Sequence, residues 1–421
     1  MPGQPVNPTR QTPSNLYFWR ATWPAIEPNL PLADKKPLNM TDARQTPDTR
    51  ADALVASYER TGYGRVDPAI LQPAEPFLDL SGEDIRRRMY LTTDANGREL
   101  CLRPDFTIAV SRDYLTSPDA GSPAGFCYLG PVFRQQDNGA GELIQAGIES
   151  FGRRDIAAAD AEIFALALEA TSAYGVAEPD IRMGDVGLFI ALVDALKISP
   201  VWKRRLIKDF NRTGRLTQDL DMLMRQTTTR TEYAGVLAAL TNSDPTAARA
   251  LVTDLLSIAG ITAVGGRTVG EIADRFLEQA TLGAGNGLPQ EIRAQIERFL
   301  AISGDPDNAL AALRSLAADT KLDLGPALDL FESRTGFLAA RGVDVSRIKF
   351  STTFGTSLDY YTGFEFSLHD ASGRASQPLV AGGRYDNLMT RLGSKTQIPA
   401  VGLGIWIENI STLSGKGANQ S

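Results

Sequence analysis

Strand-like segments occur in two separate stretches of this 421-residue chain, and the sequence between them is almost entirely helical in pattern. Residues 50–187 and 346–413 carry the strand signals, whereas residues 188–345 read as one helix after another without a fixed repeat length. This order is typical of one sheet formed by both stretches, with the helical block inserted as a second domain. We therefore expect an α+β fold in which a mixed or antiparallel sheet is flanked by helices and interrupted by an all-helical insertion.

The periodicity and the turn residues predict individual elements within this plan. Helices are predicted at residues 51–61, 106–115, 160–174, 187–196, 200–212, 230–240, 247–259, 269–280, 289–303, 309–317, 324–341, 385–392 and 405–413. Strands are predicted at residues 89–94, 99–104, 125–134, 144–151, 179–185, 347–354, 363–368, 377–381 and 400–404. The glycine-rich segment 382–387 is interpreted as a turn. Residues 1–49 are expected to be an extended or disordered tail, and residues 414–421 a loose terminus.

Composition limits the possible functions. The chain has 43 Lys and Arg residues against 50 Asp and Glu residues, a net charge of −7, which argues against a dedicated nucleic-acid binder. It has no run of about 18 apolar residues and no secretory signal, so we expect a cytoplasmic protein without a membrane partner. Cys101, Cys127 and the single histidine, His369, are too few for a disulfide framework, a Cys-rich zinc site or a multi-histidine metal site. His369 is expected to be exposed at the end of a strand.

Four segments place polar residues inside apolar, strand-like sequence: residues 102–107, 133–136, 145–152 and 358–363. In the third segment, Gln145, Gly147 and Glu149 share one strand face because side chains alternate with a period of two. Gly147 leaves space between the two polar side chains, which suits a small ligand whose amine faces Glu149. Each segment taken alone is also explained by a solvated strand face.

Taken together and in this order, the segments resemble the catalytic core of histidyl-tRNA synthetase and its paralogues. Leu102–Thr107 resembles the family's L-R-P-E-x-T, and Gly64–Pro68 resembles the first class II motif, a dimerisation element. Further matches are Tyr128–Arg134 with the second motif, Gln145–Glu149 with Q-x-G-x-E, Leu358–Tyr361 with L-D-Y-Y, Ala381–Asp386 with the second histidine signature, and Pro399–Asn409 with the third motif. The resemblance implies histidine-binding positions at Asp105, Thr107, Gln145, Glu149, Tyr360 and Tyr361.

The departures from the synthetase pattern point away from catalysis. Arg134 of the second motif is kept, as a candidate contact for an anion or ligand, but Gln136 replaces an acidic residue. Asn409, after Glu408, and Thr356 stand where the family has arginines, and both lack the charge and the donor fork. Each loss should cost roughly 3 kcal/mol of transition-state stabilisation, so we expect amino-acid activation to be lost. The chain also ends soon after the third motif, so we expect no anticodon-binding domain and no tRNA partner.

A kept histidine pocket without activation chemistry resembles one paralogue, the regulatory subunit of ATP phosphoribosyltransferase. Gln72–Arg88 also looks like the bacterial form of this paralogue. The resemblance implies a subunit without catalytic residues, cofactor or metal. It would activate the short-form catalytic subunit in the first step of histidine biosynthesis and help confer feedback inhibition by L-histidine. It further implies a homodimer within a larger hetero-oligomer. We hypothesise that Gln145 and Glu149 hold the ammonium of histidine and that Tyr360 and Tyr361 shape the imidazole end.

Two other interpretations remain open at this point. A truncated synthetase-like ligase would still activate an amino acid, and a plain binding module would hold histidine without a phosphoribosyltransferase partner. Asn409 and Thr356 speak against the ligase.

Overall fold

The computed structural model describes residues 48–136, 141–210, 216, 245–258, 269–270, 288–355 and 360–414. Apart from Asp48, all of these residues belong to one unit of the chain, Thr49–Ser421. Several predictions fall outside the described residues. They concern Thr356, Leu358, Asp359, the helix predicted at 230–240 and most of the helix predicted at 269–280. The same holds for almost all of the predicted tail (1–49) and the predicted terminus (414–421). Within the described ranges, no helix combines the length and the apolar character needed to cross a bilayer.

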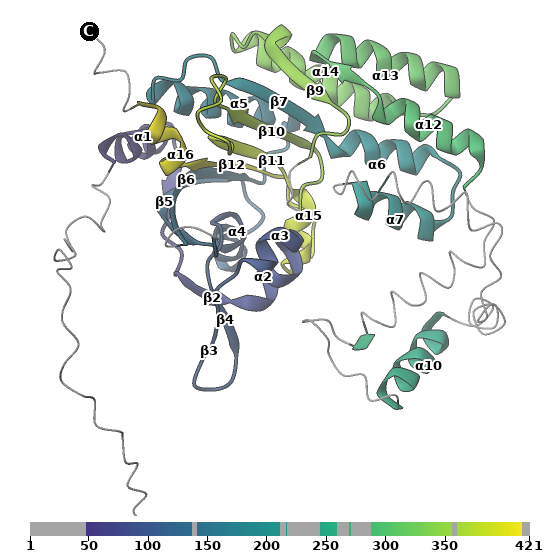
Figure 1. Cartoon of the computed structure of the whole chain (residues 1–421), viewed down its shortest axis with the longest axis horizontal. Helices are drawn as coiled ribbons and strands as arrows, with labels where there is room; N and C mark the ends of the chain where they lie inside the picture. The colour runs from purple at the N-terminus through teal and green to yellow at the C-terminus, as the bar shows by residue number, and fades with distance from the viewer. Residues whose placement is uncertain are drawn as a thin grey trace, which may run out of the picture. The chain divides into compact units, whose positions relative to one another are not determined.

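A nine-stranded mixed sheet forms the centre of this unit, in the order β1-β5-β6-β12-β11-β10-β7-β9-β8 (Figure 1). The pairs β1/β5 and β7/β9 are parallel, and the remaining neighbours are antiparallel. The strands are β1 (Gly64–Arg65), β5 (Ala124–Phe133), β6 (Glu142–Phe151), β7 (Asp180–Asp185), β8 (Ser303–Gly304), β9 (Ile348–Ser351), β10 (Phe364–His369), β11 (Val380–Arg384) and β12 (Ala400–Trp406).

The sheet joins the two strand-bearing stretches, as the sequence predicts. β6 of the first stretch pairs along its length with β12 of the second, and β7 lies between β10 and β9. The two-residue strand β8 was missed, because two residues are too few to show an alternating pattern. β8 comes from the helical stretch and adds an edge to the sheet beside β9. The domain boundaries at 187/188 and 345/346 remain predictions.

The helices predicted within the described residues are present in the predicted order, but two short helices, at Ala74–Leu80 and Gly82–Arg87, were not predicted. The helices are α1 (Thr49–Arg60), α2 (Ala74–Leu80), α3 (Gly82–Arg87), α4 (Thr107–Thr116), α5 (Ile156–Ala173), α6 (Val186–Ala195), α7 (Pro200–Phe210), α10 (Pro245–Ile258), α12 (Gln290–Leu300), α13 (Pro306–Thr320), α14 (Gly325–Ala340), α15 (Asp386–Arg391) and α16 (Ile407–Ser414), with a 3₁₀ turn at Val345–Arg347. α5 begins four residues before its predicted start. Its predicted end is confirmed by Gly175, whose φ of 81° suits a glycine that follows a helix.

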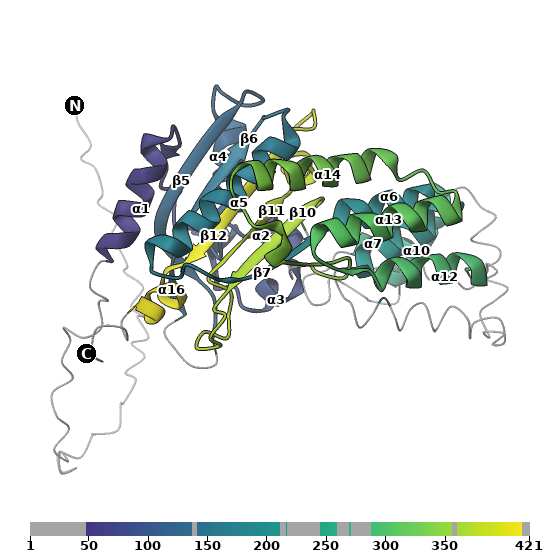
Figure 2. The ribbon, with the colours of Figure 1, turned by 90° about the horizontal axis from the view of Figure 1, so that it is seen from above.

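Alternate residues of the central strands pack into two separate hydrophobic clusters, one on each face of the sheet. On β5, Cys127 belongs to one cluster and its neighbour Tyr128 to the other. The first cluster includes α5 and α14, and Figure 2 shows α14 running beside α5. The second cluster includes residues of α2 and α4 together with Cys101 of β4 (Glu99–Leu102). β4 is the middle strand of a small sheet, between β2 (Leu71–Pro73) and β3 (Leu91–Thr93). The candidate site lies on the face of the second cluster.

Two predictions about local structure were wrong. Gly382 and Gly383 lie inside β11 rather than in a turn, because a Cβ atom there would come within 2.8 Å of the Phe366 ring and 2.9 Å of the Tyr361 ring. The strand needs glycine at these positions to let the aromatic rings approach its backbone. His369 does end a strand, but it is half-buried rather than exposed, and its Nε2 lies 2.8 Å from the Ser367 hydroxyl.

A buried ionic network joins the helical stretch to the sheet. Arg334 of α14 pairs with Asp160 of α5 at 2.8 Å and with Asp185 at the end of β7 at 2.7 Å. Asp160 also pairs with Arg384 of β11 at 2.6 Å, and Arg384 reaches Asp386 at 2.9 Å. Each charge in the network therefore has an opposite charge beside it, which buried ions require.

Candidate functional site

A cavity of about 630 Å³ opens over the face of the sheet that carries the second cluster. Its floor is formed by residues without large side chains: Gly402 and Gly404 on β12, and Ala381 on β11. The register places Gly402 opposite Glu149 and Gly404 opposite Gly147, so glycine occupies neighbouring strands at the same level. Cavities of this size commonly hold small ligands.

The floor has no room for larger side chains. A Cβ atom on Gly402 would lie 1.8 Å from Oε2 of Glu149, and one on Gly404 would lie 2.6 Å from Nε2 of Gln145. A Cβ atom on Gly147 would lie 2.4 Å from the Tyr128 hydroxyl. Glycine is therefore needed at these positions to make space for neighbouring side chains, and not to allow a turn of the backbone.

Three buried acceptors line the cavity without a hydrogen-bond partner. The third is Oε2 of Glu408, in α16. The other two belong to residues proposed from the sequence: Oδ2 of Asp105, just before α4, and Oε1 of Gln145 on β6. The other oxygen of Asp105 accepts the backbone N–H of Ile108 at 3.2 Å. Burial raises the pKa of Asp105, and the nearby Arg134 guanidinium opposes that rise. Because unpartnered buried acceptors are costly, this pair is suited to a ligand that brings N–H donors.

Three tyrosines form one end of the cavity. Tyr360 and Tyr361 precede β10, and Tyr385 follows β11. Their rings meet edge to face, with centroids 5.7 Å apart for Tyr360 and Tyr385 and 6.4 Å apart for Tyr361 and Tyr385. Burial raises the pKa of all three hydroxyls well above the ordinary value, so they are neutral at physiological pH. This end offers flat aromatic walls with hydroxyl groups at their edges.

Glu149 lies behind this end and does not line the cavity. The residue is fully buried, and its Oε1 accepts the Tyr128 hydroxyl at 3.1 Å while its Oε2 accepts the Tyr385 hydroxyl. Burial raises the pKa of Glu149 to about 8, and hydrogen bonds from Tyr385, Thr107 and Tyr128 limit the rise. Its carboxyl group therefore fixes Tyr385, which lines the cavity, and Tyr128, which does not.

Arg134 and Trp406 also line the cavity. The Arg134 guanidinium stacks over the Trp406 ring, 4.6 Å from its centroid, and Nε donates to the carbonyl oxygen of Pro104 at 2.8 Å. Glu408 and Asn409 lie next to Trp406 along the chain and also line the cavity. The amide nitrogen of Asn409 donates to the carbonyl oxygen of Pro378 at 3.0 Å.

The structure thus brings most of the residues proposed from the sequence to one cavity, Glu149 being the exception. The proposed residues that line the cavity are Asp105, Thr107, Gln145, Tyr360, Tyr361 and Arg134. Sequence reasoning missed Tyr385 and Trp406. Tyr385 lies within a motif that was noted for its glycines, and Trp406 continues the alternation that places Gly402 and Gly404 on the cavity face.

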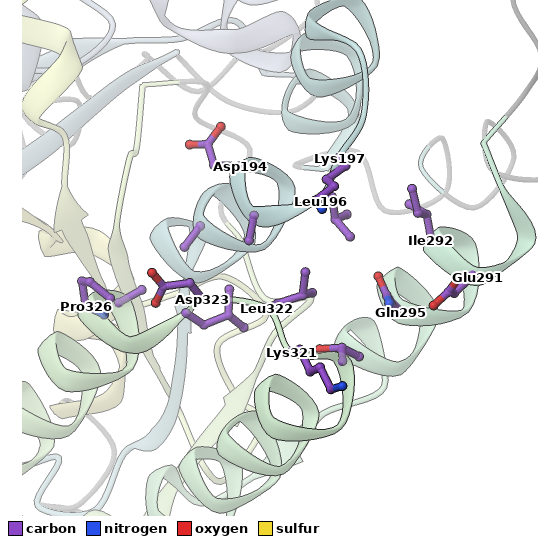
Figure 3. Close-up of a pocket in the computed structure, with 15 residues that line it drawn as sticks. Asp194, Leu196, Lys197, Glu291, Ile292, Gln295, Lys321, Leu322, Asp323 and Pro326 are labelled. Atoms are coloured by element: carbon purple, nitrogen blue, oxygen red, sulfur yellow. The ribbon is translucent and has the colours of Figure 1, made fainter.

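A second cavity, of about 970 Å³, lies among α6, α12 and the segment joining α13 to α14 (Figure 3). Its charged side chains, which include Asp194, Lys197, Glu291 and Lys321, are exposed. Asp194 is already paired with Lys203 at 3.2 Å. This cavity lacks the buried, unpartnered acceptors of the first. Nor do the described residues hold a group of three or more His, Cys, Asp or Glu side chains suited to a metal ion.

Comparison of the sequence with known proteins shows the family to which the chain belongs. The sequence profile of the family described as histidyl-tRNA synthetase matches residues 38–276 and 248–410. Proteins from Brucella canis and Brucella ovis, named ATP phosphoribosyltransferase regulatory subunit, are 40% identical to the chain over 356 residues, which is 83% of this chain and 93% of theirs. The chain belongs to the ATP phosphoribosyltransferase regulatory subunit family.

Solved structures share the fold of this chain. A protein from Bacillus halodurans, titled as an ATP phosphoribosyltransferase regulatory subunit/histidyl-tRNA synthetase, matches with a TM-score of 0.61 and 21% identity, covering 91% of this chain and 84% of that one. A histidyl-tRNA synthetase from Nostoc matches with a TM-score of 0.56 and 17% identity, covering 87% of this chain and 70% of that one. At these identities the likeness shows the shared α+β fold.

Proposed function

We propose that this protein is a non-catalytic subunit that activates the short-form catalytic subunit of ATP phosphoribosyltransferase and makes it sensitive to L-histidine. The observation that carries the proposal is the pair of buried, unpartnered acceptors, Asp105 Oδ2 and Gln145 Oε1, in a cavity that also holds Arg134. Family membership supports the choice of partner. The subunit would act in the cytoplasm, as a homodimer within a larger hetero-oligomer and without tRNA.

An α-amino acid presents opposite charges that suit this cavity. Its ammonium group would donate to Asp105 and Gln145, and its carboxylate would accept from Arg134. The hypothesis from the sequence gave the ammonium to Glu149 and Gln145. We now favour Asp105 over Glu149, because both oxygens of Glu149 already accept tyrosine hydroxyls behind the cavity wall.

The imidazole of histidine would then lie against the tyrosine end. Tyr360, Tyr361 and Tyr385 offer aromatic faces together with hydroxyl groups that donate or accept. Thr107, at the start of α4, would add a hydroxyl beside the ammonium. Glu149 would contribute by holding Tyr128 and Tyr385 in place.

The proposal that the site does not activate amino acids rests on charge. Asn409 is neutral, and its amide nitrogen is engaged with Pro378 rather than directed to a ligand. A synthetase needs cations against the triphosphate and the transferring phosphorus. Arg134 stays available for the carboxylate of the amino acid.

Feedback by histidine requires that histidine bind one state of the assembly more tightly than another. The test is reconstitution: the purified protein is mixed with a short-form catalytic subunit, and phosphoribosyl-ATP formation is followed with and without histidine. We expect strong stimulation that histidine reverses. Stimulation without histidine sensitivity would remove the feedback role. No stimulation, together with amino-acid-dependent exchange of pyrophosphate into ATP, would overturn the proposal in favour of a ligase.

Asp105→Asn tests the site directly. Loss of a charged acceptor should weaken histidine binding roughly 10- to 100-fold, measured by calorimetry. Asp113→Asn is the matched control, because it makes the same change on the exposed side of α4, and it should leave binding intact. Equal affinities for the two variants would discard the ammonium assignment.

A further inference from the structure

We propose that Trp406 is a positioning residue that holds Arg134 apart from Asp105, and so makes the cavity specific for a zwitterionic α-amino acid. The inference rests on the proposed histidine site and deepens it. It concerns which chemical class of ligand the cavity accepts: an amine with a carboxylate beside it, rather than an amine alone.

Arg134 and Asp105 are oppositely charged neighbours that do not pair. The charge of Arg134 acts on Asp105, yet no ion pair within 4.0 Å joins either one to any described residue. Opposite charges in a half-buried site normally close on one another. If these two closed, the guanidinium would occupy the oxygen of Asp105 proposed for the ammonium, and the carboxylate subsite would be lost as well.

Two contacts fix the guanidinium of Arg134 in its separate position. Its Cζ lies over the Trp406 ring, 4.6 Å from the ring centroid, and its Nε donates to the Pro104 carbonyl oxygen at 2.8 Å. The indole holds the guanidinium from one side, and the hydrogen bond anchors its Nε edge. The other four N–H groups make no hydrogen bond with described residues. Such in-plane groups are suited to a carboxylate.

The register of β12 explains why the indole is at this place. Gly402, Gly404 and Trp406 alternate along one face of the strand, and Trp406 pairs with Gln145 of β6. The two glycines leave the floor open, and the next residue on the same face is the largest side chain available. Trp406 therefore stands at the end of the open floor, beside Gln145 and under Arg134.

The test compares L-histidine with L-histidinol, which has an alcohol in place of the carboxylate. Calorimetric affinities for both ligands are measured for the wild-type protein, Trp406→Leu and Trp406→Phe. The wild-type protein should prefer histidine. Trp406→Leu keeps an apolar side chain but removes the aromatic face, so the preference should fall roughly 2- to 30-fold, the range expected for a cation–π contact. Trp406→Phe keeps an aromatic face and should retain most of the preference.

Phe337→Leu is the control for loss of an aromatic ring, because Phe337 is exposed on α14 and lies outside the cavity. It should leave the preference unchanged. If Trp406→Leu does not fold, Trp406→Met, whose side chain adapts to irregular space, takes its place with the same expectation.

Each outcome has a distinct meaning. If the wild-type protein binds neither ligand, the proposed histidine site fails and this inference fails with it. If the wild-type protein binds histidine but Trp406→Leu weakens both ligands equally, or neither, Trp406 is only a packing residue and the positioning role is overturned. A selective loss of histidine affinity in Trp406→Leu, with Trp406→Phe close to wild type, supports the role.

Discussion

The carboxyl group of Glu149 should make the stability of this protein depend on pH in a way that one substitution removes. Burial raises the pKa of Glu149 from 4.5 to about 8 in the folded protein. Glu149→Gln keeps the size of the side chain and can keep hydrogen bonds with Tyr128 and Tyr385, but it has no proton to lose. The variant therefore isolates the cost of ionising a carboxyl group in this buried position.

The sign follows from proton binding. Between pH 4.5 and about 8 the unfolded chain has released the Glu149 proton while the folded protein still holds it, so rising pH favours unfolding. The contribution is fully present below the unfolded pKa and is lost as pH rises through the folded one. With about 1.36 kcal/mol per pKa unit, wild-type protein should lose about 2.5 kcal/mol between pH 6 and pH 8.5 that Glu149→Gln keeps.

The assay is urea unfolding followed by tryptophan fluorescence at several pH values between these limits, for both proteins. The gap in unfolding free energy between wild type and Glu149→Gln should shrink or reverse as pH rises. Glu75→Gln, which makes the same change at an exposed position of α2, serves as the control and should run parallel to wild type. A gap between wild type and Glu149→Gln that stays constant across this range would refute the reasoning.

Two further substitutions test packing and charge. Arg334→Met leaves two buried aspartates without their cation and should cost about 3–5 kcal/mol of unfolding free energy by urea titration, whereas Arg298→Met, which breaks an exposed pair, should cost less than about 1 kcal/mol. Equal losses would refute the role of burial. Gly402→Ala should cost about 1–3 kcal/mol and abolish histidine binding, because the new methyl group collides with Glu149. The control is Gly336→Ala, because Gly336 lies within a helix and nothing is near the added methyl group; it should gain about 0.5–1 kcal/mol of unfolding free energy in the same urea titration. A stable Gly402→Ala variant that still binds histidine would contradict the proposal that glycine is required at the floor of the cavity.

Local signals in the sequence were sufficient for most of the elements. Gly62, with a φ of 102°, follows α1 where the helix was predicted to end, and Gly97, with a φ of 79°, lies in the turn between the strands predicted at 89–94 and 99–104. These positions are readable because glycine is required by the backbone itself. Gly382 and Gly383 were misread, because their glycines are required by the rings of distant residues, which no local pattern reveals.

The candidate site was likewise predictable only where local sequence patterns determine it. The period of two correctly placed Gln145 and Glu149 on one face of β6. It did not reveal that the Tyr385 hydroxyl, 236 positions along the chain, would satisfy Glu149 and leave Asp105 as the open acceptor. Which acceptor remains free depends on side-chain contacts between remote segments. The roles proposed for these residues in binding histidine stay predictions.

The pairing of β6 with β12 also means that β6 lacks its partner strand during much of translation. The Tyr128 hydroxyl, which holds Glu149, lies 3.3 Å from the carbonyl oxygen of Leu403, 275 positions later in the chain. At about 5–20 residues per second, a ribosome needs roughly 15–55 seconds to make that stretch. During this interval the growing polypeptide displays β6 with an open edge and an unfilled floor, a surface prone to wrong pairing. Nascent chains stalled before Ala400 should therefore be held by chaperones, and the ligand-binding state should appear only once β12 has emerged from the exit tunnel.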